Sequence, residues 1–319
     1  MPLLSPRFFI SICVSLTVLG VIYWNTDAGK VADVLLAVDG PLFLAAIAML
    51  IPTTLLSAWR FRLLMASRNR PTLAVATKLI LAASTLNVVL PSKMGDVLKS
   101  IFMSRTLDMR GSLAVSVVIF EKACDLLGLL VWCLLGLVVY GVGDDLFIIL
   151  ALAIGGGLGL GVLMLSSLSF ADLCLRLAAK IAPSSLTGKF DNLRRSWADV
   201  HGFFWRSRRS VGTITGLTLL IWLLHLIQIW MLAGSLGASV PVLSSLGLSS
   251  LAILAGLVPL TMAGIGTRDA ATIFLFAPFM TAATGAALGL MLTLRYVLPG
   301  LAGLPFLTDY LSMLREKPQ

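Results

Sequence analysis

The 319-residue sequence has little charge. Asp, Glu, Lys and Arg together make up 12% of the residues, and hydrophobic residues make up 58%. Soluble domains carry about 25% charged and about 45–50% apolar residues. The low charge therefore excludes a soluble globular protein, and the high apolar content excludes a disordered chain. The apolar runs are continuous, which also excludes a transmembrane β-barrel. The composition predicts an all-α polytopic membrane protein with one integral membrane domain over residues 1–319.

Cysteine and histidine are also scarce, with four and two residues. The cysteines form no CxxC pair and have no neighbouring His, so we expect neither disulfides nor a metal site. The sequence also lacks the Walker A, HExxH and GxSxG motifs. We therefore expect no catalytic residue and no cofactor, and a protein that is not an enzyme. The net charge of +9 indicates contact with anionic membrane lipids and not with nucleic acid.

About six to eight transmembrane helices are expected, with one or two of them re-entrant or broken. The apolar runs are residues 8–26, 40–59, 79–92, 111–140, 146–171, 210–267, 270–294 and 296–308. The run 210–267 is long enough for two crossings joined near residues 237–241. The run 79–92 is short for a crossing, which favours a re-entrant hairpin. The sequence does not decide on which side of the membrane the C-terminus lies, because residues 270–283 could form a crossing or a second hairpin.

Basic residues cluster in two stretches, which predicts the topology. Residues 60–110 contain nine basic and two acidic residues, and residues 172–209 contain eight basic and three acidic residues. By the positive-inside rule both stretches should face the cytoplasm, and so should the N-terminus. Within the second stretch, Phe190, Leu193, Trp197, Val200 and Phe204 share one helix face. That face could rest on the membrane surface, or it could pack under the helix bundle.

The first of three polar groups within the apolar segments runs from Asn87 to Lys99. Pro91 and Gly95 should break the helix there. A broken backbone at membrane depth needs protein or water around it. Asp96 and Lys99 are three residues apart and should pair on the helix that restarts, with Lys93 nearby. The alternative is an ordinary loop with a solvated ion pair.

The second group is Glu121, Lys122 and Asp125. Glu121 and Asp125 are four residues apart and share a helix face, where like charges repel. We therefore expect a cation from another segment between or opposite them, since Lys122 points elsewhere. The alternative is that the two acids face water near the membrane surface.

The third group follows the uncharged run and contains Gly264, Gly266, Arg268 and Asp269. It again combines a proline and glycine break with charged residues. Further on, Arg295 lies within another apolar run, where a lone Arg is a functional candidate. The alternative for Arg295 is that it extends to the membrane surface. Because the first and third groups are alike and lie in different halves, they suggest an internal repeat with a transport site between the two breaks.

Taken in order, the three groups resemble the transmembrane region of lysylphosphatidylglycerol synthases and related stand-alone flippase-like proteins. That family carries an Asn, a Pro-x-x-x-Gly-Glu-x-x-Arg-like stretch, Glu-Arg-x-x-Asp, and later Gly-Gly-x-Gly-x-Arg-Glu. Asp96 and Asp269 stand where Glu is usual, and Lys99 and Lys122 stand where Arg is usual. Charge sign is kept at all four positions, but Lys lacks the bidentate fork of Arg.

The resemblance implies a flippase that moves an amphipathic, anionic lipid or lipid-linked intermediate across a bacterial or archaeal inner membrane. Aminoacylation is not expected, because the sequence has no soluble domain after the last run. The alternatives are an accessory or scaffold subunit for envelope lipid synthesis, bound to a lipid-modifying enzyme or glycosyltransferase, and a membrane-embedded transferase. The expected partners are membrane lipids. The candidate substrate-binding residues are Asn87, Pro91, Lys93, Gly95, Asp96, Lys99, Glu121, Asp125, Gly264, Gly266, Arg268, Asp269 and Arg295.

Overall fold

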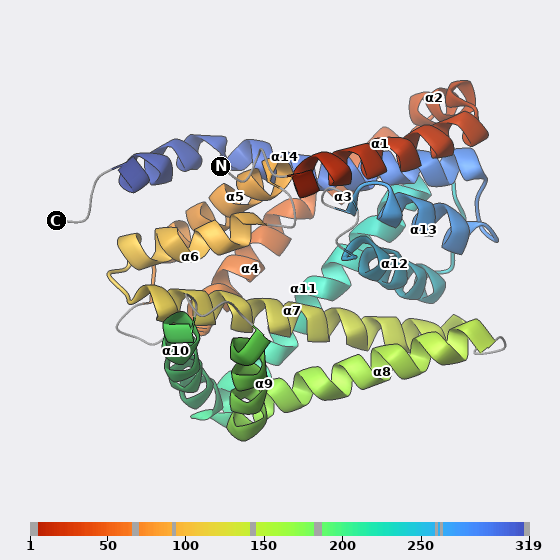
Figure 1. Cartoon of the computed structure of the whole chain (residues 1–319). Helices are drawn as coiled ribbons and strands as arrows, with labels where there is room; N and C mark the ends of the chain where they lie inside the picture. The colour runs from red at the N-terminus through yellow and green to blue at the C-terminus, as the bar shows by residue number, and fades with distance from the viewer. Residues whose placement is uncertain are drawn as a thin grey trace.

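The computed structural model describes residues 6–65, 70–90, 94–140, 145–181, 187–258, 261 and 264–315, and these residues form helices and connections without a strand (Figure 1). The all-α prediction is therefore confirmed. The helices are α1 (Pro6–Thr26), α2 (Ala28–Leu36), α3 (Gly40–Ala48), α4 (Leu50–Leu63), α5 (Leu73–Val89), α6 (Met94–Thr106), α7 (Gly111–Tyr140), α8 (Asp145–Ser166), α9 (Leu168–Ile181), α10 (Thr187–Trp205), α11 (Arg208–Ser235), α12 (Val242–Gly256), α13 (Thr267–Phe276) and α14 (Ala282–Arg315).

Five helices among the described residues are long and apolar enough to cross a membrane. They are Gly40–Leu63, Gly111–Val139, Phe147–Ser166, Arg208–Ser235 and Ala282–Thr308, and three shorter apolar helices are Cys13–Trp24, Leu73–Val88 and Val242–Gly256. The division of the run 210–267 is confirmed, because α11 and α12 are joined through Gly237, which has a φ of +77°. The run 146–171 is shorter than expected, since α8 ends at Ser166.

Two helical hairpins are arranged around the middle of the molecule (Figure 1). In the first, α5 and α6 pack side by side, and in the second α12 and α13 do so. The expected hairpin at residues 79–92 is longer than the short apolar run, because α5 begins at Leu73 and α6 is the returning arm. Thr72 caps the start of α5 by accepting a hydrogen bond from the Val75 amide. Residues 270–283 contain the end of α13, a turn and the start of α14, so by themselves they form neither a crossing nor a hairpin; α13 is the returning arm of the second hairpin.

Each hairpin is followed by a long helix, and the contacts of the two units correspond. Helix α7 packs against α6 of its own hairpin and against α12 of the other. Helix α14 packs against α13 of its own hairpin and against α5 of the other. Asp96 and Asp269 are each the third residue of the returning arm. This arrangement agrees with the expected internal repeat.

The last two apolar runs, which Arg295 separates in the sequence, are joined in one helix that also contains Pro299 and Pro305. Helix α14 continues through all three residues, and the chain turns earlier, at residues 277–281, where Pro278 lies. A proline inside a helix removes one backbone donor. Helix α5 packs against this part of α14, where the hydroxyl of Thr85 donates to the Gly300 carbonyl at 2.6 Å.

Glycine permits the close crossing of α7 and α12. Gly136 and Gly247 face each other so closely that a Cβ on either would overlap backbone atoms of the other. Gly136→Ala should therefore force the two helices apart and destabilise the protein by about 1–3 kcal/mol, as overpacking does. Gly156→Ala on α8 is the matched control, because its Cβ would meet nothing within 4 Å. The thermal unfolding temperature in detergent should fall for the first variant only; equal temperatures would contradict this account of the crossing.

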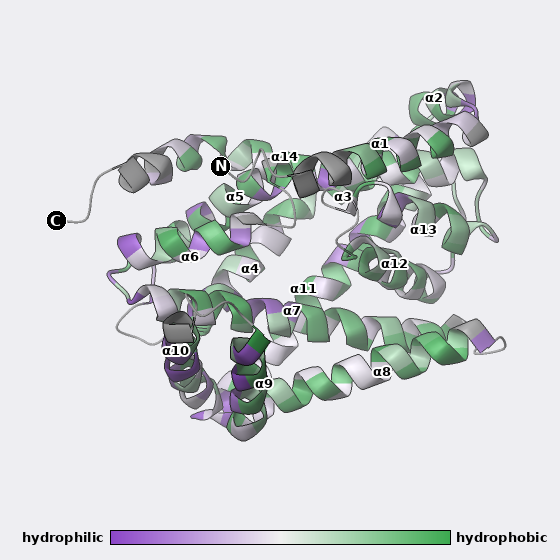
Figure 2. Cartoon of the chain, in the orientation of Figure 1, coloured by the Kyte–Doolittle hydropathy of each residue, from purple (hydrophilic) through white to green (hydrophobic). Residues whose placement is uncertain are grey.

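Helices α9 and α10 run across the direction of α7 and α8 at one end of the molecule (Figure 1). Figure 2 shows hydrophilic residues over α9 and α10 and mostly hydrophobic residues over α7 and α8. The apolar face of α10 packs under the bundle: the Trp197 and Phe204 rings lie 5.5 and 4.8 Å from the Phe120 ring of α7. Of the two alternatives for residues 190–204, the packed helix is therefore the one observed.

Candidate functional site

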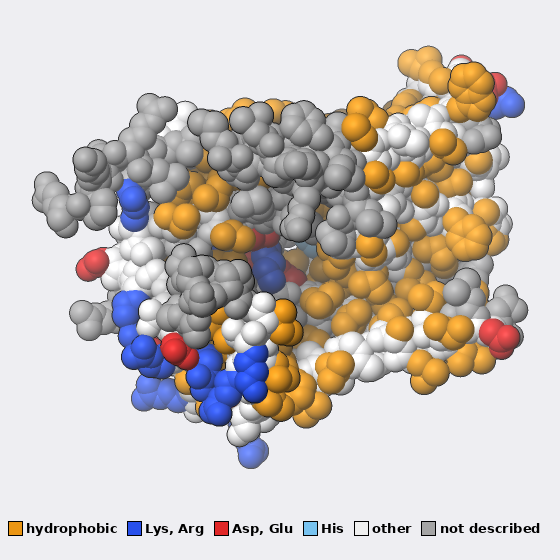
Figure 3. Space-filling model, viewed as in Figure 1, with side chains coloured by type: hydrophobic (Ala, Val, Ile, Leu, Met, Phe, Trp, Pro, Cys, Tyr) orange, Lys and Arg blue, Asp and Glu red, His pale blue; other side chains and the backbone are white. Residues whose placement is uncertain are grey.

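A cavity of about 300 Å³ lies between the two repeat units. Its walls come from α4, α5, α6, α7, α11 and α14, with Ile265 from the break before α13. Figure 3 shows basic and acidic side chains inside a hollow near the middle of the molecule, surrounded by a mainly apolar surface. The volume is at the lower end of the range for small-molecule sites, so it suits a headgroup-sized ligand.

Three carboxylates line this cavity, and each of them is paired with a cation. Asp125 lies 2.5 Å from Arg60, and Glu121 lies 2.5 Å from Lys99 and 3.8 Å from Arg60. Asp96 lies 3.3 Å from Lys122. Arg60, Lys99 and Glu121 are almost fully buried. Burial of unpaired charge is costly, so these pairs hold α4, α6 and α7 together around the cavity.

The expected pairing of Asp96 with Lys99 is wrong. Lys99 instead reaches α7, where its ammonium contacts Glu121 and lies 4.5 Å from the centre of the Phe61 ring. Asp96 is left to pair with Lys122, which also lies 3.5 Å from Asp125. The expectation that the cation between Glu121 and Asp125 comes from another segment is confirmed, and that cation is Arg60 of α4. The expectation that Lys122 points away from the two acids is wrong, because Lys122 also reaches Asp125.

Arg295 also lines the cavity, and it has a different environment. Only 5% of its surface is exposed. One guanidinium nitrogen donates to the His225 carbonyl at 3.2 Å, and the guanidinium carbon lies 5.3 Å from the centre of the Tyr296 ring. In the part of the chain that the structure describes, no carboxylate pairs with Arg295, since the three lining carboxylates are held by the other cations. Four lining cations face three lining carboxylates, which leaves one uncompensated positive charge.

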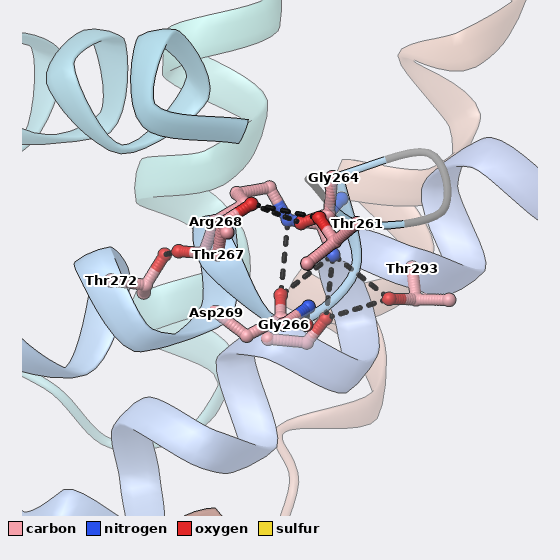
Figure 4. A network of polar contacts seen from close by, with 9 residues as sticks. Thr261, Gly264, Gly266, Thr267, Arg268, Asp269, Thr272 and Thr293 are labelled. Carbon is pink, nitrogen blue, oxygen red and sulfur yellow. Dashed lines mark hydrogen bonds and ion pairs between the residues drawn. The ribbon is translucent and has the colours of Figure 1, made fainter. Parts of the chain in front are cut away.

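The group around Arg268 forms a polar network that meets the cavity wall at Thr293 (Figure 4). Arg268 donates to one Asp269 oxygen at 3.0 and 2.7 Å, and the other Asp269 oxygen accepts the Gly266 amide at 3.0 Å. Arg268 also donates to the Thr293 hydroxyl at 2.8 Å. Both charged residues are buried. The network fixes the break before α13 against α14.

The break itself requires glycine. Gly264 and Gly266 have φ angles of +78° and +103°, which side chains rarely adopt. A Cβ on Gly264 would also lie 2.6 Å from the Gly256 carbonyl oxygen. In the first hairpin, Gly95 packs in the same way against backbone atoms of Ala83 and Asn87. The glycines therefore let the two arms of each hairpin approach closely.

The structure divides the candidate residues into three sets. Those lining the cavity are Asn87, Asp96, Lys99, Glu121, Asp125 and Arg295. The residues that shape the hairpin breaks and do not line the cavity are Gly95, Gly264, Gly266, Arg268 and Asp269. Pro91 and Lys93 lie outside the described residues.

Several lining residues are not among the candidates drawn from the sequence. Arg60 was counted only with the stretch expected at the cytoplasmic surface, yet it is 2% exposed. A polar face of α4 leads to it through Thr53 and Ser57, which also line the cavity. Their spacing of four and three residues within an apolar helix is the signal that could have indicated this wall. His225 lines the cavity too, and its Nδ1 atom is buried without a hydrogen bond to any described residue.

Comparison with known proteins agrees with this architecture. A family model described as "Lysylphosphatidylglycerol synthase TM region" matches residues 8–303. The match covers nearly the whole chain and includes both hairpins and every residue that lines the cavity. No curated protein matches the chain.

Proposed function

Because the chain belongs to the family of lysylphosphatidylglycerol synthase transmembrane regions, and is thus a multi-pass membrane protein, we propose that it moves an amphipathic, anionic lipid or lipid-linked intermediate between the membrane leaflets. The observation that carries the proposal is the uncompensated Arg295 in a headgroup-sized cavity. A buried cation that no carboxylate neutralises is costly. An anionic headgroup would supply the missing charge, and Arg suits phosphate because its planar fork donates two hydrogen bonds at once.

The remaining walls fit a headgroup with acyl chains attached. Apolar side chains such as Leu50, Ile80 and Val88 share the cavity with the charged residues. The headgroup would contact Arg295, with the hydroxyl of Ser57 on α4 as a further donor. Asp96, Glu121 and Asp125 would keep the other cations in place. They would not compete with the headgroup for Arg295, since each is already paired with another cation.

Movement of the lipid would use the two repeat units. Transporters with inverted repeats alternate by rocking one unit against the other around a central site. Here each hairpin packs against the long helices of both units. A shift between the units would therefore change the side from which lipid can enter the cavity. In this proposal the end rich in Lys and Arg faces the cytoplasm of a bacterial or archaeal cell, following the positive-inside rule.

The proposal is tested by reconstituting the purified protein in liposomes. Leaflet exchange is followed by quenching of fluorescent anionic and zwitterionic lipids from the outside. Anionic lipid should exchange faster than in protein-free liposomes and faster than the zwitterionic lipid. Absence of exchange by folded protein, in the presence and absence of a proton gradient, would contradict transport. Stable co-purification with a lipid-modifying enzyme would then favour the accessory-subunit alternative.

A further inference from the structure

One face of α9 is apolar and uncovered. Leu173, Leu177 and Ile181 follow one another at intervals of four residues, which places them on one side of the helix. Their exposed fractions are 51%, 49% and 88%. The opposite side of α9 faces the core, where Ala171 is fully buried and Leu175 packs against the same apolar cluster. The exposed side chains are therefore additional to those that hold α9 to the protein.

Charged residues bound this face on one side only. Arg176 and Lys180 lie beside the exposed apolar stripe, and both are exposed. Asp172 lies next along the polar side and is paired with Arg176 at 2.6 Å and with Arg194 of α10 at 2.5 Å. The hydrogen bond from Arg194 lowers the pKa of Asp172, so the carboxylate stays ionised at neutral pH. The pair anchors α9 to α10 and thereby fixes which side of α9 is turned outward.

The apolar face continues the surface of a membrane-spanning helix. Helix α9 begins two residues after α8 ends at Ser166, and α8 exposes Leu160, Val162 and Leu163 near that end. Figure 3 shows apolar side chains over α9 that adjoin the apolar surface over α8, with Lys and Arg side chains gathered on the other side. A helix of this composition that runs across the spanning helices is typical of the membrane interface.

We propose that α9 is an interfacial helix that binds the bilayer surface, with Leu173, Leu177 and Ile181 inserted among the acyl chains and Arg176 and Lys180 in contact with anionic headgroups. Charge complementarity and continuity with α8 identify the lipid as the occupant. For α10 the sequence left a surface helix and a packed helix as alternatives, and its apolar face is covered by α7. This inference does not depend on transport through the cavity.

The test uses the full-length protein in liposomes of mixed anionic and zwitterionic lipid. Cys13 and Cys174 are replaced by Ser, and an environment-sensitive fluorophore is attached to Leu177→Cys. The matched control is Ala198→Cys, at an exposed position on α10 at the same end of the molecule. Lipids with brominated acyl chains should quench the label at position 177 several-fold more than the label at position 198. Aqueous iodide should show the reverse order.

Each contrary outcome has a definite meaning. If iodide quenches both labels equally, α9 is in water and the inference is wrong. If neither quencher reaches position 177, a second copy of the chain or another protein covers α9, and the inference is again wrong. In a second comparison, brominated phosphatidylglycerol should quench position 177 more than brominated phosphatidylcholine. The double replacement Arg176→Gln and Lys180→Gln should remove that preference; an unchanged preference would overturn the role of these two residues.

Discussion

Replacing Arg295 by Gln is expected to reduce leaflet exchange of an anionic lipid by about ten- to hundredfold, because a hydrogen bond to a charged group contributes about 1.5–3 kcal/mol. The variant should remain folded. Arg295 makes no ion pair among the described residues, so its removal leaves three lining cations for three lining carboxylates. The measurement is the initial exchange rate in liposomes containing equal amounts of each protein.

The control for this variant is Arg110→Gln. Arg110 pairs with Asp199 at 2.8 Å, but its side chain is 70% exposed and lies outside the cavity. Exposed pairs contribute little to stability, so exchange should be close to that of the wild type. Arg295→Lys should keep part of the activity, because it retains the charge but loses the fork. Equal exchange by Arg295→Gln and the wild type would remove the main support for a headgroup site.

Replacing Arg60 by Gln is expected to destabilise the protein by about 3–5 kcal/mol, the usual effect of removing one partner from a buried ion pair. Arg60 is 2% exposed and serves both Asp125 and Glu121. Its loss would leave carboxylates partly uncompensated between α4 and α7. The measurement is the unfolding temperature in detergent, together with the amount of protein recovered from the membrane.

A double variant separates the charge effect from other consequences of losing Arg60. Asp125→Asn removes the carboxylate that lies 2.5 Å from Arg60. Arg60→Gln combined with Asp125→Asn should therefore be more stable than the sum of the two single effects predicts. Arg62→Gln is the matched control on the same helix, because Arg62 donates to the Pro71 carbonyl and forms no ion pair with the residues that the structure describes. Strictly additive effects would show that the pair does not act as described.

These two arginines also show where the sequence was informative and where it was not. Arg295 was recognisable because it interrupts an apolar run, and a charge within the membrane is costly unless it has a partner or a function. Arg60 stands at the end of an apolar run, where a basic residue is ordinary, and only the packing of α4 against its neighbours brings it to Asp125. A pair formed between residues 65 positions apart along the chain leaves no local pattern.

The hairpins were predictable for a local reason and the charge pairs within them were not. Proline and glycine interrupt helices wherever they occur in positions that lack support, so the breaks near Gly95 and Gly264 could be expected from the sequence. Pro299 shows the limit of that rule, since α14 continues through it while packed against α5. Arg268 stood out in the sequence as strongly as Arg295, yet Asp269 beside it satisfies its charge outside the cavity.

The most direct test of the central claim is to count the lipids that the protein retains. The protein is extracted from membranes containing equal amounts of anionic and zwitterionic phospholipid and measured by native mass spectrometry at increasing collision energy. The uncompensated charge at Arg295 predicts that one anionic lipid per chain is the last to dissociate, and that Arg295→Gln no longer retains it. Equal retention of zwitterionic lipid, or the same retained anionic lipid in Arg295→Gln, would contradict a headgroup site in this cavity.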